Sequence, residues 1–361
     1  MNRSFTFSEP KRARALADAI AILAPSEPTK LVHVCGTHEI TITRHGLRRF
    51  LPETVQIFEG PGCPVCVTPT RDIDAAVQIA ESGAILFTFG DMARIPGTRK
   101  TLEETRAGGA DVRVILSAAD AVRIARETDR EAVFFAVGFE TTAPSTAAIL
   151  LDDPPENFSV LVSHKLIPPA MAALLDLPGT DINGYIAPGH VSTIIGTRPY
   201  EQFPENYQLP VVVSGFEPLD VLYAVALLLR QLRDRTSKVE NAYPRAVKAK
   251  GNTQAQRLID EVFEVADTLW RGIGIIPASG LHLRKSFEHL DARTRFVIDE
   301  MDGEDVVPGC RCADVLTARA VPDQCPLFAK RCTPLSPIGP CMVGTEGACN
   351  IWFRYGGRPR L

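Results

Sequence analysis

Six of the nine cysteines in the chain lie between residues 310 and 349, in a stretch rich in proline and glycine. Four thiolates on an irregular loop can surround an iron-sulfur cluster or a zinc ion, because soft anionic sulfur suits both. The tail is therefore predicted to be a metal or redox module. Its four candidate ligands are separated by 14, 6 and 16 residues, and they are Cys310, Cys325, Cys332 and Cys349.

A zinc site and a disulfide framework are the alternatives to a cluster for this pattern. Structural zinc sites usually pair their ligands with about two to four residues between them, whereas here only Cys310 and Cys312 come close, with one residue between. A four-iron cluster is a larger body that tolerates longer spacings, and Cys-Pro pairs such as Cys325-Pro326 occur in cluster loops. A disulfide framework needs an oxidising compartment, and nothing in the chain indicates one. The spacing favours a 4Fe-4S cluster.

Two further tail cysteines, Cys312 and Cys341, exceed the count of four ligands. They are candidates for buried apolar residues, for an additional thiol pair, or for alternative ligands. We expect passive packing of both.

A second group of reactive residues is the Cys-x-x-Cys pair Cys63 and Cys66, within the sequence GPGCPVC at residues 60–66. Such a pair closes a small strained ring and cycles readily between dithiol and disulfide. A helix is expected to start just beyond the pair, with Thr68 as N-cap and Asp72 in the first turn. A zinc half-site is the alternative, but no second Cys-x-x-Cys is present. We interpret the pair as redox-active thiols.

A third group is the sequence CGTHE at residues 35–39. Cys35 and His38 are close enough on a turn for a thiolate and an imidazole to converge, and Glu39 is placed to orient the ring or accept its proton. The set is either a soft metal site or an activated nucleophile. A buried cysteine packed as a small apolar residue is the structural alternative.

Short runs of β-branched residues alternate with helical patterns along the chain, and this alternation is typical of parallel α/β layers. These strands and helices must position the three groups of reactive residues. We therefore expect an α/β fold with two small parallel-sheet domains facing a cleft, plus a C-terminal cysteine-rich iron-sulfur region. The eight predicted strands form two groups of four in chain order: Leu31–Val34, Val55–Phe58, Ala84–Phe89 and Val112–Leu116, then Ala132–Val137, Ser159–Val162, Gly184–Ala187 and Val211–Val213.

The predicted domains follow this linear order. An N-terminal helical segment covers residues 1–29, α/β domain 1 covers 30–117, α/β domain 2 covers 118–238, and a helical and cluster-binding domain covers 239–361. A helix is expected over Ala118–Glu127, because Ser117 is a suitable N-cap. A long polar helix is expected over Thr253–Leu269, before the cysteine-rich tail.

Polar residues follow most of the predicted strands. Parallel sheets bind ligands beyond the carboxyl ends of their strands, so the edges of two sheets are expected to face one cleft. Each of these residues alone could cap a helix or close a turn. Besides the cysteines, the candidates for positioning ligands or relaying protons are Asp91, Glu140, His164, His190 and Glu217.

Composition limits the class of protein. The net charge of −4 and segments of mixed sign argue against a nucleic-acid groove. The longest apolar run, Val221–Leu229, is too short to cross a bilayer. Neither a Walker A loop nor a GxGxxG loop occurs. We expect a soluble cytoplasmic protein that binds neither nucleic acid nor membrane.

Taken together, these stretches resemble the HypD family of NiFe-hydrogenase maturation factors, over almost the whole chain. The motifs that carry the resemblance are CGTHE at 35–39, GPGCPVC at 60–66, FGDMxRxPG at 89–97, GFETT at 138–142, APGHV at 187–191, SGFEP at 214–218, and EGAC at 346–349.

The resemblance implies an assembly scaffold with redox activity rather than a conventional turnover enzyme. With a small HypC partner, it would hold an iron that carries two cyanides and one carbon monoxide, for transfer through HypC to the hydrogenase large subunit. Cys35 would ligate that iron beside His38, and Cys63 and Cys66 would exchange electrons. Cyanide would come from HypE, with HypF upstream. The four tail cysteines match the family's 4Fe-4S ligands.

Two rival functions stay open at this point. A cluster-dependent protein disulfide reductase explains the redox cysteines but leaves Cys35 and His38 without a role. A zinc-stabilised binding module explains only the tail.

Overall fold

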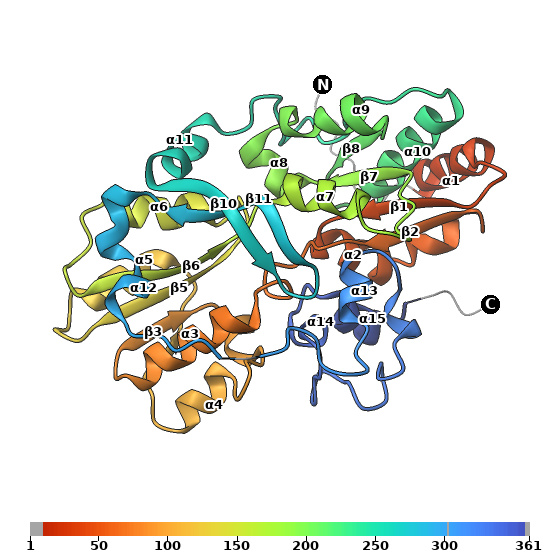
Figure 1. Ribbon diagram of the computed structural model, residues 1–361. Helices are drawn as coiled ribbons and strands as arrows, with labels where there is room; N and C mark the ends of the chain where they lie inside the picture. Colours follow the sequence, from red (N-terminus) through yellow and green to blue (C-terminus); the bar gives the residue numbers. More distant parts are fainter. Residues whose placement is uncertain (1–9, 302, 358–361) are drawn as a thin grey trace.

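The computed structural model describes residues 10–301 and 303–357 and forms two parallel β-sheets flanked by helices (Figure 1). Residues 1–9 of the predicted N-terminal segment, and residues 302 and 358–361 of the predicted last domain, lie outside the described residues. Sheet A has the order β2-β1-β7-β8-β9. Its strands are β1 (Thr29–His33), β2 (Val55–Glu59), β7 (Gly184–Pro188), β8 (Val211–Ser214) and β9 (Val239–Asn241).

Sheet B has the order β4-β3-β5-β6 and is also parallel throughout. Its central strand β5 reads AVFFAVG and is buried at every position, as expected for a parallel strand covered on both faces. Its strands are β3 (Ile85–Thr88), β4 (Val112–Val114), β5 (Ala132–Gly138) and β6 (Phe158–His164).

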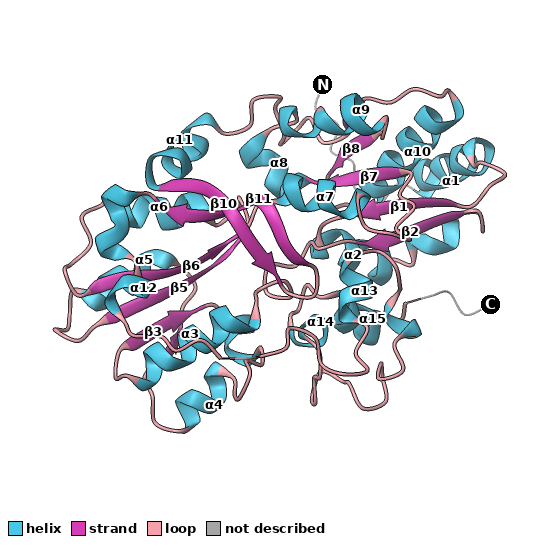
Figure 2. Ribbon diagram, viewed as in Figure 1, coloured by secondary structure: helices cyan, strands magenta, loops and turns pink. Residues whose placement is uncertain are grey.

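Helices cover both faces of each sheet, as Figure 2 shows in cyan. Helix α5 begins after Ser117, whose hydroxyl accepts a hydrogen bond from the Ala119 N–H, so the predicted N-cap is confirmed. The helices before the tail are α1 (Pro10–Leu23), α2 (Gly36–Arg44), α3 (Thr70–Glu81), α4 (Leu102–Ala107), α5 (Ala118–Ala125), α6 (Ala143–Leu151), α7 (Ile167–Leu175), α8 (Gly189–Ile195), α9 (Gln202–Tyr207), α10 (Pro218–Arg233), α11 (Thr253–Val262) and α12 (Ala292–Arg295).

All eight predicted strands are present, but their predicted grouping into two sets of four in chain order is wrong. Strands β3 and β4 pair with β5 and β6, while β7 and β8 pair with β1 and β2. The chain leaves sheet A after β2, builds the whole of sheet B, and then returns. Parallel strands are joined by crossovers, so sequence neighbours need not be sheet neighbours. Each sheet therefore draws strands from both sides of the predicted boundary at residue 117.

A second difference concerns the helix predicted over Thr253–Leu269. Helix α11 ends at Val262, and an antiparallel hairpin of β10 (Phe263–Trp270) and β11 (Gly274–Leu283) follows. Its turn contains Gly272 with a φ of +74°, which glycine adopts without strain. The hairpin lies between the two sheets and contacts β6 and α7 (Figure 1). This pairing overrides the local helical pattern.

The cysteine-rich tail consists of short elements joined by turns: α13 (Cys312–Leu316), α14 (Pro340–Val343) and α15 (Ala348–Tyr355). Helix α15 packs against α2, so the end of the chain lies beside the first motif (Figure 1). One hydrophobic core joins residues of sheet A, the hairpin and the tail, including Val34, Trp270 and Cys341. Across the described ranges, no helix combines the length and apolar character that a membrane span requires.

Candidate thiol and metal centre

Cys35 is the N-cap residue of α2, two residues beyond the end of β1. Its side chain is buried. Burial, with the nearby Glu346 carboxyl, raises the pKa of Cys35 to about 12, although the backbone N–H groups of Thr37 and His38 act in the opposite direction. The thiol therefore keeps its proton at neutral pH until a soft cation displaces it. A buried thiol of this kind fits a metal ligand better than an exposed nucleophile.

His38, three residues beyond Cys35, is a buried neutral imidazole whose ring packs on Phe216. Its pKa is lowered to about 3, mainly by burial. Its Nε2 atom lies 3.0 Å from the Gly215 carbonyl oxygen. Because a carbonyl only accepts, Nε2 carries the proton and Nδ1 has the free lone pair. Nδ1 is buried and has no hydrogen-bond partner within the described part of the chain.

Glu39 does not orient the His38 ring, contrary to the prediction. Its carboxylate accepts hydrogen bonds from His33 Nε2 at 2.8 Å, from Arg48, and from Trp352 Nε1 at 2.7 Å. Burial alone would raise the pKa of Glu39, but Arg48 and His33 outweigh it and lower the pKa. Glu39 lies one residue beyond His38 on the helix and points to another face. It anchors α2 to the tail through Trp352 in α15.

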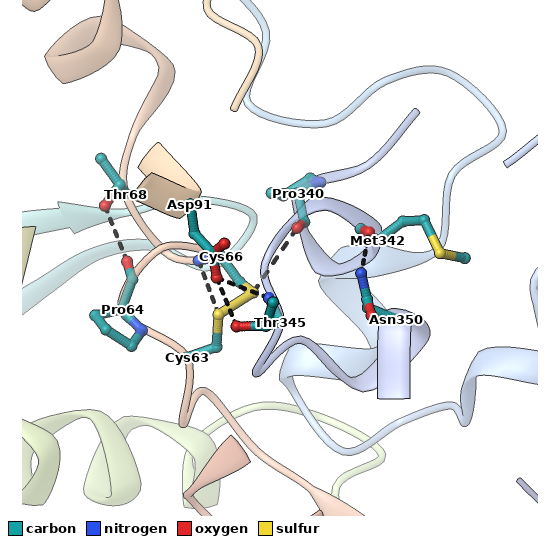
Figure 3. The surroundings of a disulfide bond; sticks show 9 residues. All are labelled: Cys63, Pro64, Cys66, Thr68, Asp91, Pro340, Met342, Thr345 and Asn350. Carbon is teal, nitrogen blue, oxygen red and sulfur yellow. Dashed lines mark hydrogen bonds between the residues drawn. A yellow bond between two sulfur atoms is a disulfide. The ribbon is translucent and has the colours of Figure 1, made fainter. Parts of the chain in front are cut away.

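Cys63 and Cys66 form a disulfide, shown in Figure 3. The Cys66 N–H donates a hydrogen bond to Cys63 Sγ at 3.2 Å. The pair is followed by α3, which begins at Thr70 with Pro69 as its N-cap residue, one position later than predicted. The preceding Gly62 accepts a hydrogen bond from the Gly36 N–H at 3.4 Å. The disulfide loop therefore lies directly against the Cys35 turn.

The tail segment from Gly344 to Cys349 contacts the disulfide at its first residue. A Cβ atom at Gly344 would lie 3.4 Å from Cys63 Sγ and 3.5 Å from Cys66 Sγ. The next residue, Thr345, is held by Asp91, whose Oδ2 accepts hydrogen bonds from its backbone N–H at 2.8 Å and its hydroxyl at 2.7 Å (Figure 3). Asp91 thus fixes the tail against the disulfide.

The same segment also reaches the Cys35 turn and the cysteine cavity of the tail. Glu346 accepts a hydrogen bond from the Thr37 hydroxyl at 3.1 Å, and its backbone oxygen would be 2.3 Å from a Cβ atom at Gly36. Cys349, three residues later, lines the cavity. The six residues from Gly344 to Cys349 therefore join all three groups of cysteines that the sequence singled out.

The tail cavity brings the predicted ligands together. Cys310 is partly exposed, and the other thiols are buried. Burial and the neighbouring thiols raise the pKa of Cys349, a crowding that a bound cation relieves. This concentration of soft donors in an apolar cavity fits an iron-sulfur cluster. Cys312 and Cys341 line the same cavity and are also buried in the hydrophobic core, in keeping with the predicted packing. The lining cysteines are Cys310, Cys312, Cys325, Cys332, Cys341 and Cys349.

The other predicted polar residues divide between the two sheets. At sheet A, His190 stacks on Phe216 at 3.8 Å between ring centroids, and Phe216 also packs on His38, so these three rings form one row. Glu217 is the N-cap residue of α10. At sheet B, His164 contacts the Thr146 hydroxyl at 2.9 Å, and no described contact links it to the cysteines.

Glu140 is a buried carboxyl at the end of β5. One oxygen accepts a hydrogen bond from the Ile167 N–H at 2.9 Å, while the other has no partner among the described residues. Burial raises the pKa of Glu140 to about 7. The group therefore titrates near neutral pH, as a proton relay requires.

This shift predicts the pH dependence of stability. Between the ordinary value of 4.5 and about 7, the folded state binds the Glu140 proton and the unfolded state has lost it, so stability falls as pH rises. Glu140→Gln is expected to remove this component, which amounts to on the order of 3 kcal/mol at pH 8 relative to pH 4.5. Urea unfolding of both proteins at several pH values measures it. Parallel pH profiles for the two proteins would contradict the assignment.

Four charged residues were not predicted: Glu346, which is partly buried, and Glu59, Lys165 and Arg271, which are buried. Both Glu59 oxygens are buried without a partner in the described ranges, and burial raises its pKa well above the usual value. Burial lowers the pKa of Lys165 to about 8. Glu59 is the last residue of strand β2, and Lys165 directly follows strand β6. A charged residue at the end of an apolar strand is a signal that could have been read from the sequence. Glu346 lies in the EGAC motif, whereas nothing local marks Arg271.

The chain is similar to known proteins over most of its length. The HypD family model, described as "Hydrogenase formation hypA family", matches residues 11–356. A protein of Methanocaldococcus jannaschii described as a hydrogenase expression/formation protein is 45% identical over 90% of this chain and 92% of its own length. The hydrogenase maturation factors HypD of Cupriavidus necator and Escherichia coli are 44% and 42% identical, over 95% and 91% of this chain and 94% and 89% of their own lengths. The chain therefore belongs to the HypD family of hydrogenase maturation factors.

Proposed function

We propose that this chain is the scaffold on which the iron half of a NiFe-hydrogenase active site is assembled and carried, together with a HypC-type chaperone. One observation supports this most strongly: the six residues from Gly344 to Cys349 contact the Cys35 turn, the Cys63–Cys66 disulfide and the tail cavity. A binding module without redox chemistry gives no reason for this convergence. We propose that this assembly takes place in the cytoplasm, where cysteine thiols stay reduced.

The iron that carries two cyanides and one carbon monoxide is the cargo of this scaffold. Cys35 would supply one thiolate, and the HypC-type partner would supply the other. A soft thiolate suits an iron with strong π-acceptor ligands, because it adds electron density. His38 is a buried neutral group three residues beyond Cys35, and its free Nδ1 lone pair is available to accept a hydrogen bond from an incoming ligand.

Cys63 and Cys66 would supply the electrons for cyanide release. Cyanide bound as a thiocyanate on a HypE-type donor, made with HypF, leaves as cyanide when its S–C bond takes up two electrons and the sulfur takes one proton. Oxidation of the dithiol to the disulfide provides two electrons and two protons, one proton for the sulfur and one that is released to solvent. The Cys63–Cys66 disulfide would be the product of that step.

The tail would hold a 4Fe-4S cluster through Cys310, Cys325, Cys332 and Cys349, all of which line the cavity. Such a cluster would supply electrons one at a time. The cysteines would hold it in an apolar cavity whose wall includes Phe328 and Met342. Low exposure to solvent is one of the factors that set the potential of a cluster.

Burial of the disulfide disfavours the reductase alternative. Cys63 is 1% exposed and Cys66 is 0% exposed. A protein disulfide substrate must bring its sulfur within bonding distance of an attacking thiolate. The buried pair does not offer that access, whereas a small ligand delivered to Cys35 comes close to it.

Metal analysis tests the cluster assignment. We expect about four irons and four sulfides per chain after anaerobic purification, without the HypC-type partner. The Cys325→Ser/Cys349→Ser protein is expected to lose most of this iron, because two cluster ligands are removed. Glu140→Gln, which lies outside the cavity, serves as the control and is expected to keep it. Stoichiometric zinc without iron in the native protein would contradict the assignment of a 4Fe-4S cluster.

A further inference from the structure

The turn of the β10–β11 hairpin lies between the disulfide loop and the cysteine cavity of the tail. The Arg271 N–H donates a hydrogen bond to the carbonyl oxygen of Val67, the residue directly after the disulfide, at 2.9 Å. On the other side, a Cβ atom at Gly272 would lie 3.2 Å from the Cβ atom of Ala313 in α13. Helix α13 begins at a cysteine that lines the cavity. One short turn therefore touches both groups of cysteines.

The side chain of Arg271 places a buried positive charge in this turn. It is 2% exposed, and its guanidinium donates hydrogen bonds to the carbonyl oxygens of Asp305 at 2.9 Å and Pro96 at 3.0 Å. Both acceptors are neutral backbone groups, and among the described residues no carboxylate forms an ion pair with this guanidinium. A buried charge is costly unless an opposite charge lies near it.

Two carboxylates interact with Arg271 at longer range, and other groups hold both of them. The Asp305 carboxylate accepts a hydrogen bond from the Thr70 N–H at 2.8 Å. The Asp74 carboxylate accepts one from the Thr98 N–H at 2.7 Å. The described fold therefore leaves the guanidinium without a direct counter-charge.

The other electrostatic neighbours of Arg271 are thiols of the tail cavity. Its charge interacts with Cys312 and Cys341, and it favours the thiolate form of Cys310, a predicted cluster ligand. A 4Fe-4S cluster with four thiolate ligands has a net charge of about −2, which becomes about −3 after the uptake of one electron. A cluster in this cavity would supply the counter-charge that Arg271 lacks.

We propose that Arg271 is the counter-charge of the tail cluster and raises its reduction potential. A fixed positive charge stabilises the reduced cluster more than the oxidised cluster, because the reduced cluster has one more negative charge. Arg271 is a positioning residue in this role, since it acts through its electric field and is not a ligand. The guanidinium stays charged at any pH at which the protein is folded.

This charge opposes the effect of the cavity itself. A cavity that is shielded from solvent and lined by anionic sulfur disfavours an added electron. Arg271 reduces that cost from the turn that also touches the disulfide loop. The inference rests on the proposed function, because it needs the tail cluster, but it needs neither the iron cargo nor a partner.

A redox titration of the purified chain tests the proposal. With dithionite as reductant and mediator dyes, electron paramagnetic resonance measures the ratio of reduced to oxidised cluster at each potential. Arg271→Gln removes the charge but keeps a hydrogen-bond donor. We expect this ratio to fall about tenfold at a given potential, which is about 59 mV for a one-electron couple. Arg271→Lys keeps the charge but loses the forked donor, so its ratio is expected to stay close to the native value.

Lys165→Gln is the matched control. It removes a cation that is 1% exposed and that shares the neighbour Asp305 with Arg271, whereas its other charged neighbours belong to α3 and α12. Its titration is expected to match that of the native protein. Loss of a buried positive charge that lies away from the tail thiols is thereby separated from loss of the charge beside them.

Each result decides the role of Arg271. Equal ratios in the native and Arg271→Gln proteins would overturn the proposal. The same change in Arg271→Gln and Arg271→Lys would also overturn it, because the hydrogen bonds and not the charge would then be responsible. If Arg271→Gln loses its iron, retention of iron in Arg271→Lys supports the counter-charge, and loss from both variants refutes it. A native chain without iron contradicts the proposed cluster itself, whereas native iron with an unchanged potential contradicts only this inference.

Discussion

Cys35→Ser is expected to abolish loading of the proposed iron cargo, while the proposed tail cluster and the Cys63–Cys66 pair stay in place. A serine hydroxyl has nearly the size of the thiol but remains protonated and binds iron weakly, so the predicted ligand is lost without a cavity. We expect a fall of at least about 100-fold in loaded iron, more than an outer-shell change produces. Hydrogenase maturation in a complemented strain is expected to drop to background.

Infrared spectra of the chain purified with its HypC-type partner measure this loading through the cyanide and carbonyl bands. Cys325→Ser is the complementary variant, because it alters a predicted cluster ligand and leaves Cys35 intact. It is expected to lower the cluster iron, whereas Cys35→Ser is expected to keep it. Cyanide and carbonyl bands of native strength in the Cys35→Ser complex would refute the assigned iron site.

The strands and the reactive groups could be predicted because their signals are local. Each of the eight strands is a short apolar run with turn residues at its ends, and each is present. The six tail cysteines and the Cys63–Cys66 pair stand out by residue type and spacing alone. The structure adds to them a common meeting point, the segment from Gly344 to Cys349.

Sheet pairing could not be predicted, because it depends on contacts remote in sequence. Strand β1 pairs with β7, some 150 residues later, and a local pattern says nothing of that choice. The β10–β11 hairpin was missed for a similar reason. Its residues alternate only partly between buried and exposed, and each strand is stabilised by the other and by β6.

The hydrogen-bond partners of individual side chains within the site could not be predicted from the sequence either. Glu39 is adjacent to His38 in sequence, so proximity suggested that the two interact. The two side chains point in different directions from helix α2, so Glu39 forms hydrogen bonds with Arg48 and Trp352, whereas His38 forms one with Gly215. The residue that does approach Cys35 is Glu346, 311 positions away in the chain. Tertiary packing alone creates this contact.

Gly62→Ala tests whether function depends on the close approach of the disulfide loop to Cys35. A Cβ atom at residue 62 would lie 2.2 Å from the Cys35 backbone nitrogen and 2.3 Å from the Val34 carbonyl carbon. Both are backbone atoms, so no flexible side chain can move aside and the two loops must separate. We expect a loss of about 1–3 kcal/mol in the free energy of unfolding, as for other overpacked sites.

We expect separation of the two loops to reduce iron loading more strongly than it reduces the free energy of unfolding. The reason is that electron exchange and ligand delivery both need Cys35 beside Cys63. Gly90→Ala is the matched control, since its Cβ atom would meet only Val114 Cγ1 at 3.6 Å, an ordinary contact. Urea unfolding and infrared spectra of the HypC-type complex measure both effects. We expect cyanide and carbonyl bands to vanish in Gly62→Ala and to persist in Gly90→Ala. Cyanide and carbonyl bands of native strength in a folded Gly62→Ala protein would mean that iron loading does not require the close approach of the two loops. The proposed coupling between Cys35 and the disulfide would then be wrong.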